Sequence, residues 1–345
     1  MNYTDDIRSV AMLCFPWEKL SGCNILITGA SGLIGSCLVE VLMSRPDRDY
    51  SVYAMGRNKS RLEFLFRQYT SDNSFHIIIH DVSIPITVDC PFQYIIHAAS
   101  GAAPIDFAQH PVEVMKANIL GISNLMDYGI SHSLQRMLYV SSGEVYGEGD
   151  GRVFVEDYSG YVNPMLPRSC YPSSKRAAET LCVCYGAEYG VDVVVARPCH
   201  VFGPCFTESD NRAYAQFIRN VLRGEDIIMK SNGEQFRSWC YVVDCVSALL
   251  LILLKGESGH AYNVADEVSN ITIRELAEMI ANIGNRKVVM DVSTASERAG
   301  YNMVTKSVFS TTKLRELGWV VLPQSMKEKM VSTINHQYKL EGLGN

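Results

Sequence analysis

The segment Thr28-Gly29-Ala30-Ser31-Gly32-Leu33-Ile34-Gly35 decides the fold. A continuous apolar run precedes it and apolar residues at helical spacing follow it, so we expect a strand, a tight turn and a helix. Gly29 permits the turn, Gly32 lets backbone amides approach a pyrophosphate, and Gly35 allows the helix to pack closely on the strand. The segment predicts a dinucleotide-binding turn, and a plain glycine-rich turn is the simpler alternative.

Short β-branched runs alternate with helical stretches on both sides of this segment. Parallel strands joined by right-handed crossovers have this order, so we expect an α/β fold, a doubly wound parallel Rossmann sheet with a smaller α/β lobe at its C-terminal side. The expected strands cover 24–28, 51–55, 75–79, 94–97, 137–141 and 192–196, and the expected helices cover 33–43, 111–128, 173–189 and 214–222.

The later part of the chain is more irregular. Thr272 and Glu275 have the spacing of a capping box, which predicts the start of another helix. We assign residues 1–197 and 238–264 to the dinucleotide-binding Rossmann domain and residues 198–237 and 265–345 to the substrate-binding lobe.

Composition excludes several classes of protein. The 345 residues carry 31 Lys and Arg against 37 Asp and Glu, and no basic block is present, so nucleic acid is not an expected partner. Eleven scattered cysteines, an odd number, favour reduced thiols. The acids Asp5 and Asp6 and the short apolar run 246–254 predict neither a signal peptide nor a membrane span, so we expect a cytoplasmic protein with no membrane partner.

We also expect no metal site. Cys182 and Cys184 lie two apart on an expected helix, where their side chains point in different directions, and no second pair has the spacing of metal ligands.

Tyr171 and Lys175 are the first candidates for catalysis. In Tyr171-Pro172-Ser173-Ser174-Lys175 the two residues lie four apart, so on a helix they share one face. The ammonium is then expected to lie beside the phenol and to lower its pKa from about 10 towards neutrality, which suits a proton donor and acceptor. Ser142, at the end of an expected strand, lies between this pair and the glycine turn in the sequence.

On these motifs the chain resembles the extended short-chain dehydrogenase/reductase family, specifically the NAD-dependent nucleotide-sugar epimerases, dehydratases and decarboxylases. The resemblance extends from Asn24 to Trp319. It implies that Tyr171 is the catalytic acid/base, that Lys175 orients the nicotinamide ribose, and that Ser142 hydrogen-bonds the reacting hydroxyl. The cofactor-binding residues are expected to be Gly29, Ser31, Gly32, Leu33, Ile34, Gly35, Arg57, Asp81, Val82, Ala98, Ala99, Asn118, Tyr171, Lys175 and Pro198. Without the resemblance, Asp81 would be interpreted as a turn acid and Asn118 as a surface amide.

Within this family the chain most resembles the UDP-glucuronate decarboxylases, through the segments 160–164, 167–171 and 175–181. Glu144 matches a glutamate that decarboxylases and 4,6-dehydratases share and that simple 4-epimerases usually lack. A carboxylate there can remove a proton beside a transient ketone, and a purely structural glutamate is the alternative. Gly143 departs from the family, which has Ser in decarboxylases and Asp in glucose dehydratases; glycine can neither protonate a leaving hydroxyl nor bind a carboxylate.

The resemblance further implies that the substrate is bound by Ser142, Glu144, His200, Arg212, Arg237 and Arg298. Arginine suits a diphosphate because its planar guanidinium donates two parallel hydrogen bonds to phosphate oxygens. The family has Asn at the position of His200, so a structural imidazole is as plausible there as a ligand-binding one, and lone arginines are usually solvated.

The expected cofactor is tightly bound NAD, and NADP is a serious alternative. The sequence Met55-Gly56-Arg57-Asn58-Lys59 lacks the Asp that usually holds the adenosine ribose of NAD, and Arg57 can pair with a 2′-phosphate or stack on the adenine.

The sequence predicts an enzyme, a lyase or isomerase, that oxidises the 4-hydroxyl of a nucleoside-diphosphate sugar and then acts at carbons 5 or 6, as a decarboxylase or a dehydratase does. The alternatives are a 4-epimerase, an NADPH-dependent 4-ketosugar reductase, and a dinucleotide-sensing binding protein without turnover. By analogy with relatives, helices 111–128 and 173–189 predict a homodimer.

Overall fold

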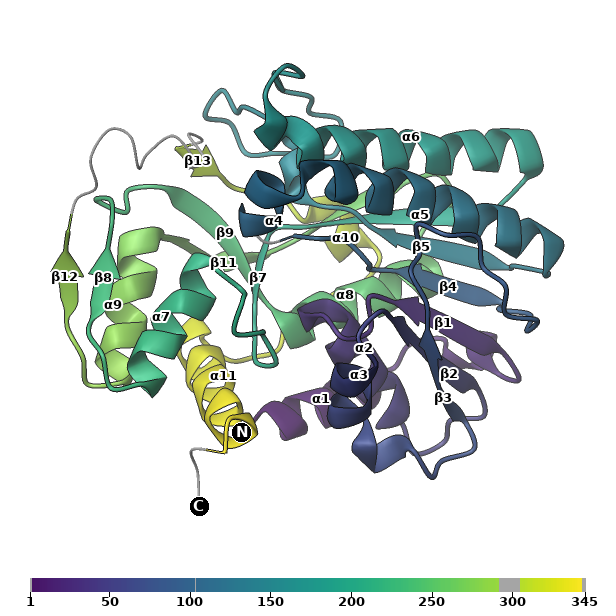
Figure 1. Ribbon diagram of the computed structural model, residues 1–345, viewed down its shortest axis with the longest axis horizontal. Coiled ribbons are helices and arrows are strands. Elements are labelled where there is room, and N and C mark those ends of the chain that lie inside the picture. The colour runs from purple at the N-terminus through teal and green to yellow at the C-terminus, as the bar shows by residue number, and fades with distance from the viewer. Residues whose placement is uncertain (1, 103, 292–304, 343–345) are drawn as a thin grey trace.

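The computed structural model describes residues 2–102, 104–291 and 305–342, and its largest element is a seven-stranded parallel sheet (Figure 1). The strand order is β10-β6-β5-β4-β1-β2-β3. Chain order reverses at β1, which pairs with β2 on one side and with β4 on the other, so the crevice at the carboxyl ends of these strands is where a ligand is expected. The doubly wound α/β fold is confirmed. The strands are β1 (Asn24–Thr28), β2 (Ser51–Gly56), β3 (Phe75–Ile79), β4 (Tyr94–His97), β5 (Arg136–Val140), β6 (Val193–Pro198) and β10 (Ala261–Val264).

Helices cover both faces of this sheet (Figure 1). On one face α5 (Pro111–Ser131) packs along α6 (Cys170–Tyr189), and on the other α2 (Leu33–Met43) packs against α8 (Val242–Lys255). Residues 242–254 of α8 are all buried, because the sheet lies on one side of this helix and α1 (Tyr3–Ala11) and α2 lie on the other. Among the described helices, none is long and apolar enough to cross a membrane.

The structure corrects several expected boundaries. Helix α6 begins at Cys170 rather than at residue 173, so Tyr171 and Lys175 both lie within it, and Pro172 is tolerated because it stands in the first turn. β5 ends at Val140, one residue before the expected end. The N-terminal helix α1 and the seventh strand β10 were not expected. The apolar residues of α1 do follow helical spacing, but the helix has only nine residues, and β10 has only four.

A smaller sheet lies beyond the carboxyl ends of the large one. Its central strand β9 (Phe236–Tyr241) pairs in parallel with β7 (His200–Phe202) and β13 (Lys306–Ser307) and antiparallel with β11 (Asp266–Thr272). Strand β9 continues directly into α8 without a loop. The expected domain limits stay a prediction. The remaining elements are α3 (Lys59–Leu65), α4 (Pro104–Gln109), α7 (Ala213–Leu222), β8 (Ile227–Met229), α9 (Ile273–Ile283), β12 (Val288–Met290), α10 (Thr312–Glu316) and α11 (Met326–Leu340), with 3₁₀ turns at Trp17–Leu20, Arg67–Tyr69, Gly143–Tyr146 and Pro167–Ser169.

Buried polar groups hold the smaller sheet and the last helix to the large domain. The Lys329 Nζ atom of α11 lies 2.8 Å from Asp244 Oδ2 on α8 and 3.5 Å from Asp266 Oδ2 at the start of β11. Thr272 and Glu275 form the expected capping box at the start of α9.

Candidate active site

The glycine turn has the geometry of a dinucleotide cradle. Gly29 has φ +68°, and a Cβ atom there would lie 2.6 Å from the carbonyl oxygen of Ala98. A Cβ at Gly35 would overlap the backbone of Gly29 and lie 2.8 Å from the Ala30 Cα atom. Gly32 is the N-cap of α2, where no side chain caps the helix and no acid lies in the first turn. The turn therefore leaves room and helix N-terminal amides for a pyrophosphate, so these residues fit a dinucleotide.

Leu33 and Ile34 form the first turn of α2, and the carbonyl of Ser31 accepts a hydrogen bond from Arg61 Nε at 3.0 Å. Arg61 also donates to the carbonyl oxygen of Cys205 at 2.5 Å, so it connects the glycine turn to the segment after β7. The sequence analysis missed Arg61, which carried no recognisable spacing.

Arg57 and Asp81 lie at the outer edge of this cradle. The exposed Arg57 guanidinium lies 3.5 Å from Asp81 Oδ2, and Asp81 Oδ1 accepts hydrogen bonds from the amide and hydroxyl of Ser83 at 2.9 and 2.8 Å. Burial favours the neutral carboxyl, but the bonds from Ser83 and Arg57 outweigh it and hold the pKa of Asp81 below its ordinary value. Asp81 is thus an ordered anion directly before the buried Val82.

The end of β4 forms the floor of the cradle. His97 Nδ1 lies 2.7 Å from Thr28 Oγ1, which also accepts a hydrogen bond from the amide of Ala99 at 3.4 Å. Burial, with the nearby charge of Lys175, lowers the pKa of His97 to about 3, so the imidazole is neutral. This network fixes the Ala98-Ala99 backbone against Gly29; neither His97 nor Thr28 was assigned a separate role from the sequence.

Tyr171 and Lys175 lie on one face of α6, as expected, but the charge does not act on the phenol as expected. Lys175 is buried, and its Nζ atom donates to the carbonyl of Val140 at 2.9 Å and lies 4.8 Å from the centre of the Tyr139 ring and 5.8 Å from that of Tyr171. Burial lowers the pKa of Lys175 to about 7.

The pKa of Tyr171 is raised, which corrects the expectation that Lys175 lowers it. Burial and the negative charge of Glu144 raise it to about 12, although Ser142 and the positive charges of Arg212 and Arg168 lower it. The reason is that the ring is enclosed by protein while the ammonium is directed at a backbone carbonyl. The phenol is therefore protonated at neutral pH.

Ser142 and Glu144 meet Tyr171 from the 3₁₀ turn after β5. Ser142 caps this turn, accepting a hydrogen bond from the Glu144 amide at 3.2 Å. The Glu144 carboxylate is paired with Arg168 at 2.7 Å. Glu144 is therefore held by the side chain of Arg168. The alternative considered from the sequence, a structural glutamate bound by backbone amides, is a different arrangement.

A stack of three side chains fixes the phenol in place. The Phe107 ring stacks on that of Tyr171, with centroids 4.6 Å apart and the ring planes inclined by 27°. The Arg168 guanidinium lies 4.5 Å from the centre of the Phe107 ring, which belongs to α4. Arg168 thus contacts both Glu144 and the ring that packs on Tyr171. Arg168 belongs to a segment that carried the decarboxylase resemblance, so that match was the available signal for it; Phe107 had none.

Asn118 is buried rather than on the surface. Its Nδ2 atom donates to Ser174 Oγ at 3.0 Å, and Ser174 Oγ donates to the carbonyl of Tyr171 at 3.1 Å. Asn118 therefore supports the first turn of α6. Pro198, at the end of β6, is also buried.

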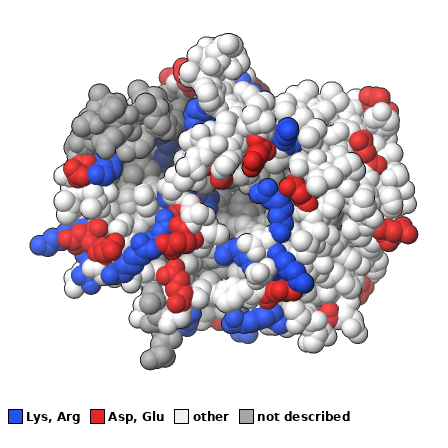
Figure 2. All heavy atoms as spheres, viewed as in Figure 1, with Lys and Arg blue, Asp and Glu red and all other residues white. Residues whose placement is uncertain are grey.

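Three basic side chains face the site, two from the smaller sheet and one from the residue that precedes α7. Arg237 on β9 is buried, and burial lowers its pKa to about 10 although Glu144 opposes this. Arg212 pairs with Asp210, with Nε 2.9 Å from Oδ1. His200 on β7 is exposed to solvent on one side and has its ring 5.3 Å from that of Trp239; desolvation by the neighbouring protein, with the charges of Arg237 and Arg212, lowers its pKa. Figure 2 shows a hollow near the middle of this face, with Lys and Arg at its rim.

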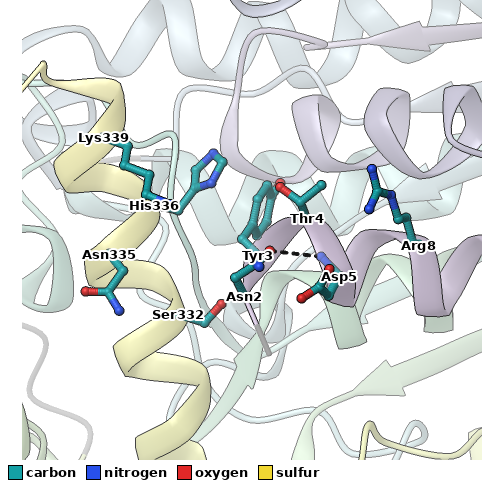
Figure 3. Close-up of a pocket in the computed structure, with 9 residues that line it drawn as sticks. All are labelled: Asn2, Tyr3, Thr4, Asp5, Arg8, Ser332, Asn335, His336 and Lys339. Carbon is teal, nitrogen blue, oxygen red and sulfur yellow. Dashed lines mark hydrogen bonds between the residues drawn. The ribbon is translucent and has the colours of Figure 1, made fainter. Parts of the chain in front are cut away.

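Three further observations concern the limits of the site. Arg298 lies outside the described residues. A depression of about 300 Å³ between α1 and α11 (Figure 3) is lined by none of the expected site residues, so it is not the catalytic site. Within the described ranges no group of His, Cys, Asp or Glu is arranged to hold a metal ion.

Comparison with known proteins gives one consistent family. The model of the NAD dependent epimerase/dehydratase family matches residues 25–265. UDP-glucuronic acid decarboxylase 6 of Arabidopsis thaliana is 35% identical over 267 residues, which are 76% of this chain and 75% of the relative. UDP-glucuronic acid decarboxylase 1 of Xenopus tropicalis is 35% identical over 67% of this chain and 53% of its own length.

Solved structures share the fold over nearly the whole chain. The UDP-glucose 4-epimerase of Thermotoga maritima is 24% identical with a TM-score of 0.76, and the alignment covers 92% of this chain and 99% of the other. The dTDP-glucose 4,6-dehydratase DesIV of Streptomyces venezuelae, solved with NAD bound, is 21% identical with a TM-score of 0.78, covering 92% and 97%.

Proposed function

Because this chain belongs to the NAD-dependent epimerase/dehydratase family, we propose that it oxidises the 4-hydroxyl of a nucleoside-diphosphate sugar and then acts at carbons 5 or 6, with decarboxylation as the favoured outcome. The observation that carries the proposal is the meeting of a phenol, a hydroxyl and a carboxylate, those of Tyr171, Ser142 and Glu144, at the carboxyl ends of parallel strands.

Each of these groups has a task that suits its surroundings. Ser142, which lies next to Tyr171, holds the reacting hydroxyl. Tyr171 is the catalytic acid/base: its neighbours hold the ring still, and its protonated phenol gives up and recovers a proton as charge develops on the sugar oxygen. Glu144, oriented by Arg168, relays a proton to carbon 5 after carbon dioxide has left; in a dehydration it would instead remove the proton from that carbon.

The cradle around Gly29, Gly32 and Gly35 would hold the dinucleotide, and Lys175 would hold its nicotinamide ribose. When bound, the dinucleotide supplies the hydride acceptor for carbon 4 and returns the hydride at the end of the cycle. We propose NAD, tightly held and recycled in place. NADP remains the alternative, supported by the exposed Arg57.

The substrate diphosphate is proposed to bind Arg237 and Arg212, with His200 beside them and Arg298 as a further ligand. Arg237 supports this because a buried guanidinium is stabilised by an anion, which offsets the cost of its burial. A nucleoside-diphosphate sugar supplies such an anion without requiring a basic surface elsewhere.

We also propose a cytoplasmic homodimer. All eleven cysteines have free thiols, as in a reducing compartment.

Helices α5 and α6 lie side by side on the sheet, and their outer surfaces expose the apolar side chains Val112, Leu120, Ile130, Val183 and Tyr189. Sedimentation velocity checks the assembly: a monomer that persists at micromolar concentration would contradict the dimer.

The proposed reaction is tested by incubating the purified protein with UDP-glucuronate, UDP-glucose and dTDP-glucose and measuring product mass. Loss of carbon dioxide from UDP-glucuronate without added dinucleotide supports the proposal. Unchanged mass with altered chromatographic retention indicates a 4-epimerase. Turnover of a 4-ketosugar that depends strictly on added NADPH indicates a reductase, and bound dinucleotide without turnover of any sugar indicates a sensor.

A further inference from the structure

The ring of Phe309, from a distant part of the sequence, occupies the space that a side chain at position 143 would need. A Cβ atom at Gly143 would lie 2.5 Å from Cε1 of Phe309 and nearer still to Cζ. Side chains essentially never approach so closely, so no residue larger than glycine fits between Ser142 and Glu144 while this ring keeps its place.

The Phe309 ring is held firmly and cannot easily give way. The two residues on either side of Phe309 are hydrogen-bonded to the backbone of Phe154. The Phe154 amide donates to Val308 O at 2.7 Å, and the Ser310 amide donates to Phe154 O at 2.9 Å. The Phe309 amide donates to Ser238 Oγ at 3.1 Å, next to Arg237 on β9. The ring is 2% exposed and packs edge-on against that of Phe154.

We propose that Phe309 is a specificity-determining residue, because it excludes any proton-donating side chain from position 143 and thereby limits the enzyme to substrates whose leaving group departs without a proton. This inference rests on the proposed function, in which a 4-ketone forms beside Ser142, Tyr171 and Glu144. It assigns a sugar that carries a carboxylate at carbon 6 as the substrate, in place of one that carries a hydroxyl.

The chemistry of the two leaving groups explains the selection. In decarboxylation the bond from carbon 5 to the carboxylate carbon breaks, its electron pair moves into the ketone as an enolate, neutral carbon dioxide departs, and carbon 5 then takes up a proton as the ketone re-forms. In dehydration a base removes the carbon 5 proton and the bond from carbon 6 to its oxygen breaks. Hydroxide is a poor leaving group, so that oxygen must receive a proton to depart as water. With the Phe309 ring against Gly143, decarboxylation remains possible, whereas dehydration has no side chain at position 143 to protonate the departing oxygen.

Phe309→Ala, Gly143→Asp and the double variant test this assignment. Each protein is incubated with UDP-glucuronate and with UDP-glucose, and losses of carbon dioxide and of water are measured by mass, alongside the melting temperature. Gly143→Asp alone is expected to lower the melting temperature and abolish turnover, because the carboxylate meets the ring. In the double variant we expect the melting temperature to recover towards that of Phe309→Ala and the ratio of water loss to carbon dioxide loss to rise at least tenfold over Phe309→Ala.

A matched pair elsewhere in the same aromatic cluster is the control. A Cβ at Gly149 would lie 2.9 Å from Phe154 Cζ, so Gly149→Asp with Phe154→Ala repeats the exchange away from Ser142 and Glu144. This pair should show coupling in melting temperature and no change in the product ratio.

The possible failures are distinguishable. If the wild type releases water from UDP-glucose, the inference is wrong while the nucleotide-sugar function stands. If Gly143→Asp alone is as stable and active as the wild type, or the double variant keeps the ratio of Phe309→Ala, the role of Phe309 is refuted. If the wild type converts neither substrate, the proposed function fails and the inference fails with it.

Discussion

Replacing Lys329 by methionine should strongly weaken the attachment of α11 to the large domain. The Lys329, Asp244 and Asp266 side chains are 1%, 0% and 4% exposed, so the carboxylates of this group have no solvent to replace the lost cation. Removing one partner of a buried ion pair costs about 3–5 kcal/mol. That is a large share of the roughly 5–15 kcal/mol by which native domains are stable. Methionine keeps most of the volume, so the loss reports charge rather than packing.

The structure also predicts how the deficit depends on pH. Burial already raises the pKa of Asp244 to about 6, although Lys329 lowers it. Without Lys329 the carboxyl takes up a proton at higher pH than in the wild type, so the deficit of Lys329→Met should shrink as the pH falls from the alkaline side towards about 6 and stay constant below it, where Asp244 is protonated in both proteins. Adding Asp244→Asn should restore more than half of the loss at pH 7, because Asp266 keeps its hydrogen bond from Ser269 at 2.7 Å.

Urea denaturation of the wild type, the two variants and Lys327→Met, an exposed lysine of the same helix, provides the measurement. A loss below about 1 kcal/mol in Lys329→Met, or a double variant no more stable than the single, would refute the reasoning. An equal loss in Lys327→Met would show that any lysine of α11 matters, and not the buried group.

Three further outcomes follow from the site and the core. Tyr171→Phe should lower kcat by about 10²–10⁴, while Tyr185→Phe on the same helix leaves it within twofold; equal rates in both variants would remove Tyr171 from the chemistry. Arg168→Gln should lower kcat more than it changes KM, and Arg168→Lys should recover part of the loss, whereas an effect on KM alone would indicate substrate binding. Burial raises the pKa of Glu40 to about 7, against a hydrogen bond from Tyr3, so its contribution to stability is present below about pH 4.5 and is lost as the pH rises through 7. At about 1.4 kcal/mol per pKa unit, this contribution to the free energy of unfolding is at most about 3 kcal/mol, and it is smaller because Glu40 is partly exposed. Thermal unfolding of the wild type and of Glu40→Gln at several pH values tests it. Parallel pH profiles of the two proteins would exclude a contribution from Glu40.

Local patterns predicted the parts of the fold that depend on neighbouring residues. The turn from Gly29 to Gly35 could be identified because its glycines, strand and helix are contiguous. Strand β10 was missed because its four residues, Ala261–Val264, neither alternate nor form a long apolar run, and only pairing with β6 makes them a strand.

The site was predictable in its residue types and less so in its electrostatics. Helical spacing placed Tyr171 and Lys175 on one face, but the pKa of the phenol depends on enclosure by segments distant in the sequence. The partner of Glu144, 24 residues away, has no spacing rule to identify it. Phe309 is farther still, and only the folded chain brings it to Gly143.

The direct passage from β9 into α8 has a consequence for ligand selection. Arg237 lies on β9, which continues into α8, and α8 packs between the large sheet and α2. The glycine cradle joins β1 of that sheet to α2, so Arg237 and the cradle belong to one packed unit. The distance between Arg237 and the cradle, the two proposed anion-binding points, is therefore set by the backbone. In the proposed function, a sugar nucleotide with one phosphate more or fewer is therefore expected to react poorly, because Arg237, the proposed diphosphate ligand, is fixed on β9 and does not shift to compensate.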